Sequence, residues 1–495
     1  MFKEIDPKRF FISLTLICFF IGWTLINLNF ANQIFGTLQK DISNNLGWLI
    51  ILASNGFMIF ILYLGLSKYG GIKLGGKKAV PEFSYKSWIA MLFSAGLGIG
   101  LLFYGVAEPI IHLDSFPIGN EIAFSDRAQK SMNLTYLHWG FHGWSVYAVV
   151  GLCFAVSAYN FNSPFRISSM IDNKLTKKSF GRIVIDVLAI IATIFGIATS
   201  LGLGATQINT GLSYLGLIDQ SFVNKIWIII LITMLGLVSV MLGLKTGIKK
   251  LSEINIVLCF CLLLIVFILG PTIFILNGVI ENIGSYIQNL ISLSTWGETY
   301  QGTSWQNNWT LFYYTWWFAW SPFVGLFIAR ISYGRSIKEF VIGVVIVPSL
   351  LVFLWMGVFG NAAIYFEHSG GIDLSSAVNQ DISTSLFVFL EQFPLAKILI
   401  SASLLIIVTF FVTSADSGAL VTSMLTTKKE TNQDEDPPML ARLIWASSLG
   451  IVSIVLLAGG GLGALQTSVL VTGVPFAIII TIACFTLIER LKKLI

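Results

Sequence analysis

The sequence predicts an all-α polytopic membrane protein, because its apolar residues are too many and too continuous for a soluble fold. Of its 495 residues, 55% are hydrophobic and only 11% are charged, whereas a soluble domain carries roughly a quarter charged residues. The apolar residues gather in runs of about 20, the length that a helix needs to cross a bilayer. Lipid must cover most of the surface, so helices that satisfy their own backbone hydrogen bonds are expected.

Twelve such runs follow one another along the chain, which predicts twelve transmembrane helices. We place them at 10–28, 47–67, 86–107, 131–158, 183–214, 225–244, 253–277, 309–329, 337–365, 395–424, 439–458 and 466–488. Two further segments, 278–295 and 374–392, mix apolar and polar positions. These two are expected to lie on the outer surface as short helices.

The basic residues support this count. With the N-terminus inside, twelve spans leave all but five of the 30 Lys and Arg on the inner side, the five being Lys40, Arg127, Lys130, Lys225 and Lys397. Basic residues gather in cytoplasmic loops, and one missed helix would invert every later loop. The pattern therefore predicts a multi-pass protein with both termini in the cytoplasm. Since the basic residues are not gathered on one segment, the expected partner is membrane lipid and not nucleic acid.

Several chemistries have no signal in the chain. There is no GxxxxGK[ST] motif, so ATP is not the expected energy source. The five cysteines lie in apolar runs without CxxC pairing, and the His, Cys and Glu spacings of a transition-metal site are absent. No set of nucleophile, base and orienting residue is visible either. We therefore expect neither an enzyme nor a cofactor, which leaves an ion gradient or facilitated passage.

The third span, MLFSAGLGIGLLFYGVAEP (91–109), has glycine at three alternate positions, Gly96, Gly98 and Gly100. Each glycine inside a helix costs about 1 kcal/mol relative to alanine. Two interpretations stay open. Gly96 and Gly100 can form a small-xxx-small contact with another helix. Alternatively, the helix unwinds at mid-membrane and its backbone binds an ion or an anionic group.

The eighth span, WTLFYYTWWFAWSPF (309–323), carries an aromatic stripe. Phe312, Trp316 and Trp320 recur every four residues, with Trp317 beside them. Tryptophan is common at the membrane interface, but Trp320 lies about 16 Å along the helix from Trp309, too deep for that role. Rings at this depth either pack a core or form a cage. The negative faces of such a cage hold a quaternary ammonium group at roughly 2 kcal/mol or more per desolvated ring.

The tenth span, TFFVTSADSGAL (409–420), places Thr413, Ser414, Asp416 and Ser417 in an apolar run. Hydroxyls in such helices often bond back to the backbone. Together with carbonyls they are also hard oxygen ligands, suited to a small alkali cation. A lone acid at this depth is costly and usually functional.

These segments closely resemble the betaine/carnitine/choline transporter family. The glycine stretch, the segment WTLFYYTWWFAWSPFVGLFIARISYGRSIKEF (309–340) and FFVTSADS (410–417) carry the resemblance, which covers essentially the whole chain. It implies a LeuT-like fold of two inverted repeats of five helices, preceded by two extra helices. The implied division is 1–85 for the first two helices, 86–277 for the first repeat, 278–308 for the outer amphipathic segment, 309–488 for the second repeat and 489–495 for a short cytoplasmic tail.

The resemblance also assigns roles to side chains in substrate binding. It implies that a trimethylammonium group is held by an aromatic cage of Trp139, Tyr147, Trp316, Trp317 and Trp320. Phe312 is implied to lie on the exit route. Gly96, Gly98 and Gly100 are implied to form a flexible stretch near the substrate carboxylate.

Sodium is the coupling ion that the resemblance implies. One ion is implied to bind the backbone carbonyls of Ser94, Leu97 and Phe410 and the hydroxyls of Thr413 and Ser414. A second site of the family uses two threonines and a phenylalanine. Thr193 and Phe323 match it, but Ile197, which cannot coordinate an ion, replaces the other threonine.

The implied function is sodium-coupled symport of a quaternary-ammonium compatible solute, working by alternating access and serving osmoprotection. Choline carriers of the family often have aspartate at the position of Gly100, so Gly100 favours a zwitterion such as glycine betaine. Thr413 and Ser414 argue against sodium-independent carnitine exchange. A choline or carnitine carrier, or a sodium-independent exchanger, remains the alternative. The resemblance further implies a homotrimer in a bacterial inner membrane.

Overall fold

The computed structural model describes residues 4–97, 100–115, 117, 123–172, 174–242, 249–428 and 437–495, without the side chains of 93–97, 174–175, 240, 242 and 249–252. Within these ranges strand pairing is limited to isolated bridges, such as Ile5 with Thr427. The helices are α1 (Pro7–Ile26), α2 (Leu28–Leu66), α3 (Tyr85–Leu97), α4 (Gly100–Ser115), α5 (Phe124–Trp139), α6 (Phe141–Ala155), α7 (Lys174–Lys177), α8 (Ser179–Tyr214), α9 (Phe222–Leu242), α10 (Lys249–Leu269), α11 (Thr272–Ser294), α12 (Trp305–Asn308), α13 (Thr310–Ile331), α14 (Ile337–Val341), α15 (Val347–His368), α16 (Leu374–Gln380), α17 (Ser385–Leu390), α18 (Ala396–Leu425) and α19 (Met439–Lys492).

The prediction of an all-helical polytopic membrane protein is confirmed. Among the described residues, eight helices are long and apolar enough to cross a bilayer, or nine if the bent pair α10 and α11 counts as one span. This number is lower than the twelve predicted spans. Two features of the chain, at the end of α10 and in the middle of α19, show how helices and predicted spans differ.

The seventh predicted span, 253–277, is shorter in the structure because the chain turns within it. α10 ends at Leu269, and α11 leaves at an angle of 113° from Thr272. Gly270 and Pro271 lie between them. Proline has no N–H to continue a helix and pushes the preceding residue out of the helical conformation. The amphipathic helix α11 therefore begins earlier than the predicted outer segment.

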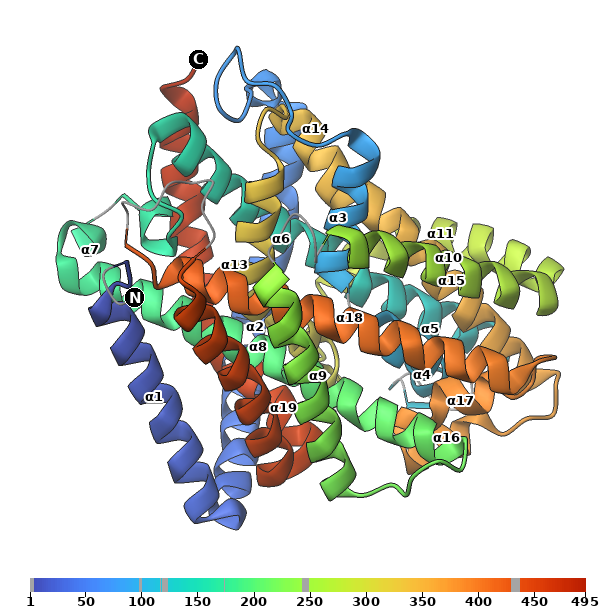
Figure 1. The fold of residues 1–495 in the computed structure, drawn as a ribbon. Coiled ribbons are helices and arrows are strands. Elements are labelled where there is room, and N and C mark those ends of the chain that lie inside the picture. Colours follow the sequence, from blue (N-terminus) through green and yellow to red (C-terminus); the bar gives the residue numbers. More distant parts are fainter. Residues whose placement is uncertain are drawn as a thin grey trace.

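The longest helix, α19, combines the predicted spans 439–458 and 466–488. It runs for 54 residues, but the backbone is not helical at Gly460 and Gly461. Gly461 has φ 59°, a left-handed conformation that glycine adopts without steric cost. The chain turns back at this break, so the two halves run in opposite directions (Figure 1).

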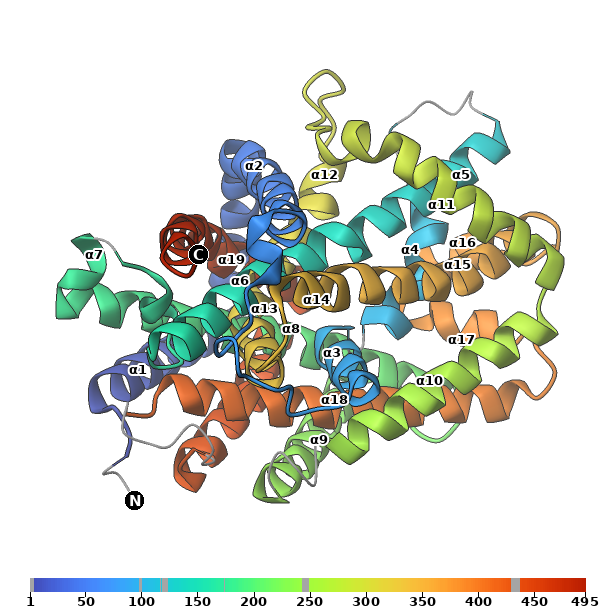
Figure 2. The same cartoon turned by 90° about the horizontal axis from the view of Figure 1, so that it is seen from above.

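The helices divide into a buried centre and a lipid-facing periphery. Every residue of α13 except Arg330 is buried, and α6, α8 and α19 pack against this helix, which lies among them in both ribbon views (Figures 1 and 2). The peripheral helices expose large apolar side chains, such as Phe19 of α1 (69%), Met234 of α9 (59%) and Ile268 of α10 (65%). Such apolar faces are typical of helices that lie against lipid.

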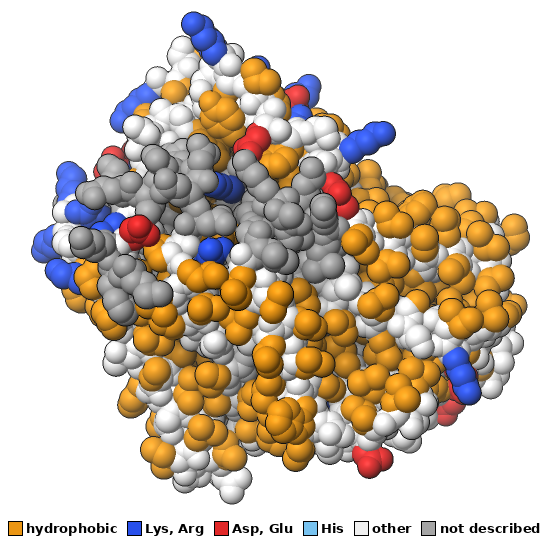
Figure 3. Space-filling view, viewed as in Figure 1, with side chains coloured by type: hydrophobic (Ala, Val, Ile, Leu, Met, Phe, Trp, Pro, Cys, Tyr) orange, Lys and Arg blue, Asp and Glu red, His pale blue; other side chains and the backbone are white. Residues whose placement is uncertain are grey.

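Hydrophobic and basic side chains occupy different parts of the surface. Hydrophobic side chains form a broad band, while most visible Lys and Arg gather at the upper left of the view (Figure 3). The two ends of the chain lie on this same side (Figure 1).

Candidate substrate and ion site

The predicted aromatic cage is built where α5 and α6 meet α13. α5 ends at Trp139 and α6 starts at Phe141, with Gly140 between them. A Cβ on Gly140 would lie 2.5 Å from the ring of Phe353 and 2.6 Å from the carbonyl oxygen of Tyr136, so a side chain here would prevent this joint. The joint brings Trp139 and Tyr147 to the same face of α13.

The six aromatic residues predicted for the substrate route form one continuous cluster. The ring centroid of Trp139 is 6.2 Å from that of Trp316 and 5.9 Å from that of Trp317. Tyr147 is 4.9 Å from Trp317, and Trp320 is 6.4 Å from Trp316. Phe312 stacks on Trp316 at 5.3 Å. Each of the six is at most 8% exposed, so none of these rings faces lipid.

Glycines let three of the indoles lie where they do. An added Cβ would be 2.1 Å from the Trp139 ring at Gly100, 2.3 Å from the Trp317 ring at Gly143 and 2.7 Å from the Trp320 ring at Gly196. Side chains do not pack at such distances without displacement. The position of Gly100 is thus explained by the close approach of Trp139.

The roles of Gly96 and Gly98, the other two of the three alternate glycines, are not explained in this way. Gly98 lies outside the described residues. Gly96 belongs to α3, in the part of that helix whose side-chain surroundings are not described, as do Ser94 and Leu97. The choice between helix packing and unwinding at Gly96 and Gly98 therefore stays a prediction.

Three indole N–H groups are used to orient rings of the cluster. Trp317 donates to the backbone oxygen of His138 at 2.9 Å, and Trp320 donates to that of Gly196 at 2.6 Å. Trp139 donates to a carboxylate oxygen of Glu108 at 2.6 Å. These hydrogen bonds hold the rings before any ligand arrives.

The fourth indole is different. Trp316 Nε1 is buried and has no hydrogen-bond partner within the described part of the chain. The same is true of the hydroxyl of Tyr104, whose ring centroid is 6.3 Å from that of Trp316. Buried polar groups are nearly always hydrogen-bonded. Among the described residues these two donors have no acceptor, so they are available to one on a bound ligand.

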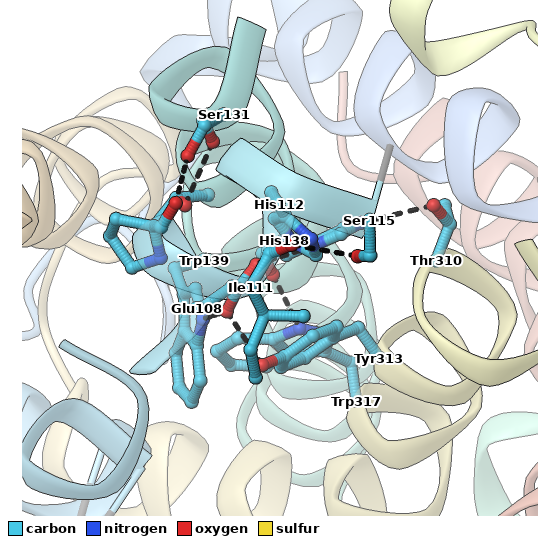
Figure 4. A network of polar contacts seen from close by, with 12 residues as sticks. Glu108, Ile111, His112, Ser115, Ser131, His138, Trp139, Thr310, Tyr313 and Trp317 are labelled. Atoms are coloured by element: carbon cyan, nitrogen blue, oxygen red, sulfur yellow. Dashed lines mark hydrogen bonds and ion pairs between the residues drawn. The ribbon is translucent and has the colours of Figure 1, made fainter. Parts of the chain in front are cut away.

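Sequence reasoning missed Glu108, the acid of the third span. Its carboxylate is fully buried and accepts hydrogen bonds from Trp139 and Tyr313, while His112 and His138 face its other oxygen (Figure 4). The signal was present, because an acid in an apolar run indicates function. We applied that rule to Asp416 and not to Glu108.

The cluster of Glu108, His112 and His138 also has the donor types of a metal site. Glu108 Oε1 is 2.5 Å from His138 Nδ1 and 3.1 Å from His112 Nε2. Tetrahedral ligands with bonds of about 2.1 Å stand about 3.4 Å apart. The shorter separations are those of direct hydrogen bonds, so the geometry is that of a hydrogen-bonded cluster.

The predicted sodium ligands of α18 are buried, and the hydroxyl of one of them, Thr413, is bonded to its own helix. The hydroxyl of Thr413 donates to the backbone oxygens of Thr409 (3.1 Å) and Phe410 (2.9 Å). Ser414 is 9% exposed. α18 packs against α3, the helix of the other two predicted ligands. The structure thus brings the two helices together, while the predicted coordination of an ion is untested.

The three positions of the second predicted ion site are all buried, while its binding of an ion is untested. The hydroxyl of Thr193 is buried without a partner among the described residues, and Phe323 packs 5.6 Å from Trp320. The third position holds Ile197, which is fully buried and lies against Gly418. An apolar side chain therefore occupies the place of an oxygen ligand.

Comparison with known proteins agrees with this architecture. Residues 8–494 match the model of the BCCT family, the betaine/carnitine/choline family transporters. The chain is 40% identical to a glycine betaine transporter of Acinetobacter baylyi, covering 99% of this chain and 74% of that protein. It is 39% identical to the glycine betaine transporter OpuD of Bacillus subtilis, covering 100% and 96%.

Two further proteins are similar to this chain, one in sequence and one in structure. The chain is 38% identical to a glycine betaine/proline/choline transporter of Vibrio parahaemolyticus, covering 99% of this chain and 90% of that protein. A sodium-coupled sialic acid symporter is similar with a TM-score of 0.41 and 12% identity over 89% of this chain and 86% of that one, which is too weak to carry an argument. The family match over nearly all residues and the full-length relatives agree, and so the chain belongs to the betaine/carnitine/choline family of transporters and is a membrane transporter, not an enzyme.

Proposed function

We propose that this protein is a sodium-coupled symporter of a quaternary-ammonium compatible solute, with glycine betaine as its main substrate. The carrying observation is the buried cluster in which three indoles are held by hydrogen bonds, while Trp316 Nε1 and the Tyr104 hydroxyl have no partner in the part of the chain that the structure describes. A trimethylammonium group cannot donate a hydrogen bond, so aromatic faces are its natural environment. The two unpartnered donors suit an acceptor on the same small molecule, such as a carboxylate.

A zwitterion is favoured over choline for a steric reason. Trp139 lies so close to Gly100 that even one added carbon would overlap its ring. An aspartate at Gly100, the counter-charge of many choline carriers, requires Trp139 to move. The names of the Acinetobacter and Bacillus relatives point to glycine betaine as well, whereas the Vibrio relative is named for choline and proline too.

Sodium coupling is proposed from α18 and its contact with α3. Thr413 and Ser414 offer hydroxyls, and Phe410 offers a carbonyl, within one turn of helix. An ion that bridges the two helices would stabilise the arrangement in which the cage is accessible. Ion and solute then promote each other's binding by the same factor, as linkage requires. A sodium-independent exchanger or a choline or carnitine carrier on this scaffold is the alternative.

We further propose twelve spans in two inverted five-helix repeats after two extra helices. Supporting this, the 54 residues of α19 amount to about 81 Å of helix at 1.5 Å per residue, which is enough for two crossings of the membrane, and the break at Gly460 and Gly461 divides them. α13 has 22 residues, long enough to cross a bilayer, although its Trp and Tyr residues lower its hydropathy and it is not among the eight helices counted above. The predicted third span is covered by α3 and α4 together. The gathered Lys and Arg and the nearby termini suit a cytoplasmic side in a bacterial plasma membrane. A homotrimer is proposed from the resemblance alone.

Uptake of labelled glycine betaine into proteoliposomes tests the proposal. An inward sodium gradient should drive accumulation, and excess choline should compete more weakly than unlabelled betaine. Equal uptake in potassium-only buffer would contradict sodium coupling. Counterflow without any cation gradient would favour the exchanger.

Replacing Trp320 with leucine gives a direct test of the cage. Removal of one desolvated ring at about 2 kcal/mol should raise the half-saturation concentration for betaine about thirtyfold. Trp48→Leu is the matched control, because this tryptophan is 64% exposed on α2. An unchanged half-saturation concentration in Trp320→Leu would remove the aromatic cage from the mechanism.

A further inference from the structure

Glu108 connects a buried polar cluster to the aromatic cage. One oxygen of its carboxylate, Oε2, accepts from Trp139 Nε1 and from the hydroxyl of Tyr313, each at 2.6 Å. The other oxygen, Oε1, faces His138 Nδ1 at 2.5 Å and His112 Nε2 at 3.1 Å. These four side chains converge on the carboxylate of Glu108 in the interior of the helix bundle (Figure 4).

The two donors to Oε2 both belong to the wall of the cage. The ring of Tyr313 is 5.3 Å from that of Trp139 and 6.3 Å from that of Trp316. The rings of Trp139 and Tyr313 come from different helices, α5 and α13. One carboxylate oxygen of α4 therefore holds two rings on two helices in a fixed mutual orientation.

The far end of Trp139 is confined as well. Its Cη2 atom lies only 2.1 Å from the position that a Cβ on Gly100 would take, and its Nε1 is bonded to Glu108. An indole N–H can only donate, so the ring has no second hydrogen-bonding mode to fall back on. Rotation of the ring would break the bond to the carboxylate.

The histidine side anchors the carboxylate in turn. His138 Nε2 is 3.0 Å from the hydroxyl of Thr310 at the start of α13, and the backbone oxygen of His138 accepts from Trp317. Hydrogen bonds to a charged acceptor are roughly twice as strong as neutral ones. Glu108 is thus supported on both sides by groups that also position cage residues.

We propose that Glu108 is a positioning residue of the substrate site, which orients Trp139 and Tyr313 so that their rings face the bound ammonium group. It need not touch the solute. Its effect reaches the substrate through the hydrogen bonds to the two rings. The identity of the substrate in this proposal rests on the proposed function, whereas the orientation of Trp139 by Glu108 does not.

The first test measures uptake in three variants. In Glu108→Gln the amide oxygen can still accept from both rings, though more weakly, so we expect the half-saturation concentration for betaine to rise about tenfold with the maximal rate within about twofold of wild type. Glu108→Asp keeps the charge but is one methylene shorter. We expect it to resemble Glu108→Ala, with a rise of at least about fiftyfold, because its oxygen falls short of both donors.

The order of these effects decides between positioning and charge. If Glu108→Asp were close to wild type while Glu108→Gln behaved like Glu108→Ala, the charge alone would matter, and the proposal would be overturned. Glu298→Gln is the matched control, since Glu298 is also a buried acid but accepts from backbone N–H groups, those of Trp305 and Gln306. If Glu108→Ala does not fold, Tyr313→Phe removes one of the two donors and should raise the half-saturation concentration about fivefold.

The second test follows Trp139 directly. Protein labelled with 5-fluorotryptophan gives a fluorine resonance for Trp139, assigned by its absence in Trp139→Phe. This resonance should shift in Glu108→Gln and Glu108→Asp without any solute, and should stay in place in Glu298→Gln. An unshifted resonance would overturn the positioning role even if betaine is the substrate. A shifted resonance in a protein that does not transport betaine would contradict only the proposed function.

Discussion

The aromatic cluster and the hydroxyl-bearing turn of α18 are both buried candidate sites, yet they differ in how far they are assembled. In the cluster, Trp139, Trp317 and Trp320 are already held by hydrogen bonds to other elements. In α18, the hydroxyl of Thr413 bonds to carbonyls of its own helix, one of which belongs to the predicted ligand Phe410.

This difference indicates two kinds of binding. The rings are organised in advance, so a solute that fits them loses little free energy to reordering. The Thr413 hydroxyl is bonded within α18 alone, and its oxygen lone pairs can coordinate an ion while its O–H donates, so completion of the ion site depends on how α18 lies against α3. A preformed cage beside an ion site whose ligands come from two separate helices suits a coupled carrier, because an ion that favours one arrangement of those helices shifts the population toward it. The predictions below test this contrast, from the largest expected effect to the smallest.

Removing both α18 hydroxyls should have the largest effect. In Thr413→Ala with Ser414→Ala, sodium loses two oxygen ligands, and we expect sodium-driven betaine uptake to fall about a hundredfold or more, at about 1.5 kcal/mol or more per ligand. Uptake measured against sodium concentration checks this. Thr409→Ala is the control, because Thr409 lies on the same helix and its hydroxyl donates to the backbone oxygens of Leu405 and Ile406. Normal uptake in the double variant would favour a sodium-independent exchanger.

The second largest effect is expected from a side chain added at Gly100, beside the ring of Trp139. Gly100→Ala adds a carbon where the ring of Trp139 lies, and overpacking of this kind costs about 1–3 kcal/mol. We expect the dissociation constant for betaine to rise about thirtyfold, as measured by equilibrium binding to the protein in detergent. Gly284→Ala serves as the control, since no heavy atom lies within 4 Å of a Cβ there. Equal affinity in the two variants would mean that the preformed ring positions are unimportant.

Loss of the free indole N–H should give a smaller, selective effect. Trp316→Phe keeps an aromatic ring but removes the unpartnered donor, so betaine should lose about 1 kcal/mol, a rise of about fivefold in its half-saturation concentration. Choline has no carboxylate, and its inhibition constant should therefore change less. Competition assays compare the two ligands in the same preparation. Equal changes for both would show that the N–H does not meet the carboxylate.

The smallest effect is expected at the second candidate ion site. Because Ile197 cannot coordinate, Thr193→Ala should leave the dependence of uptake on sodium concentration within about twofold of wild type. Charge movement per betaine molecule, measured on a solid-supported membrane, should also be unchanged. A reduced charge-to-solute ratio in this variant would establish a second ion that the chain binds without the missing threonine.

The sequence alone was enough for the features that repeat along one helix. The apolar runs predicted a polytopic helical protein, and the stripe of Phe312, Trp316 and Trp320 predicted a buried aromatic face, because side chains four residues apart share one side of a helix. The family resemblance supplied the partners from other helices. The turn at Gly270 and Pro271 was missed because the apolar run continues through it into the amphipathic helix that follows.

Tertiary structure decided which groups meet across helices. Gly143 and Gly196 belong to no sequence pattern that indicates a function, yet each makes room for an indole of α13. Glu108 reads as one acid in an apolar run, but its role depends on four partners that are up to 205 residues away along the chain. The physical reason is that local pattern determines which face a side chain takes, whereas hydrogen bonds and close approaches depend on how separate helices pack.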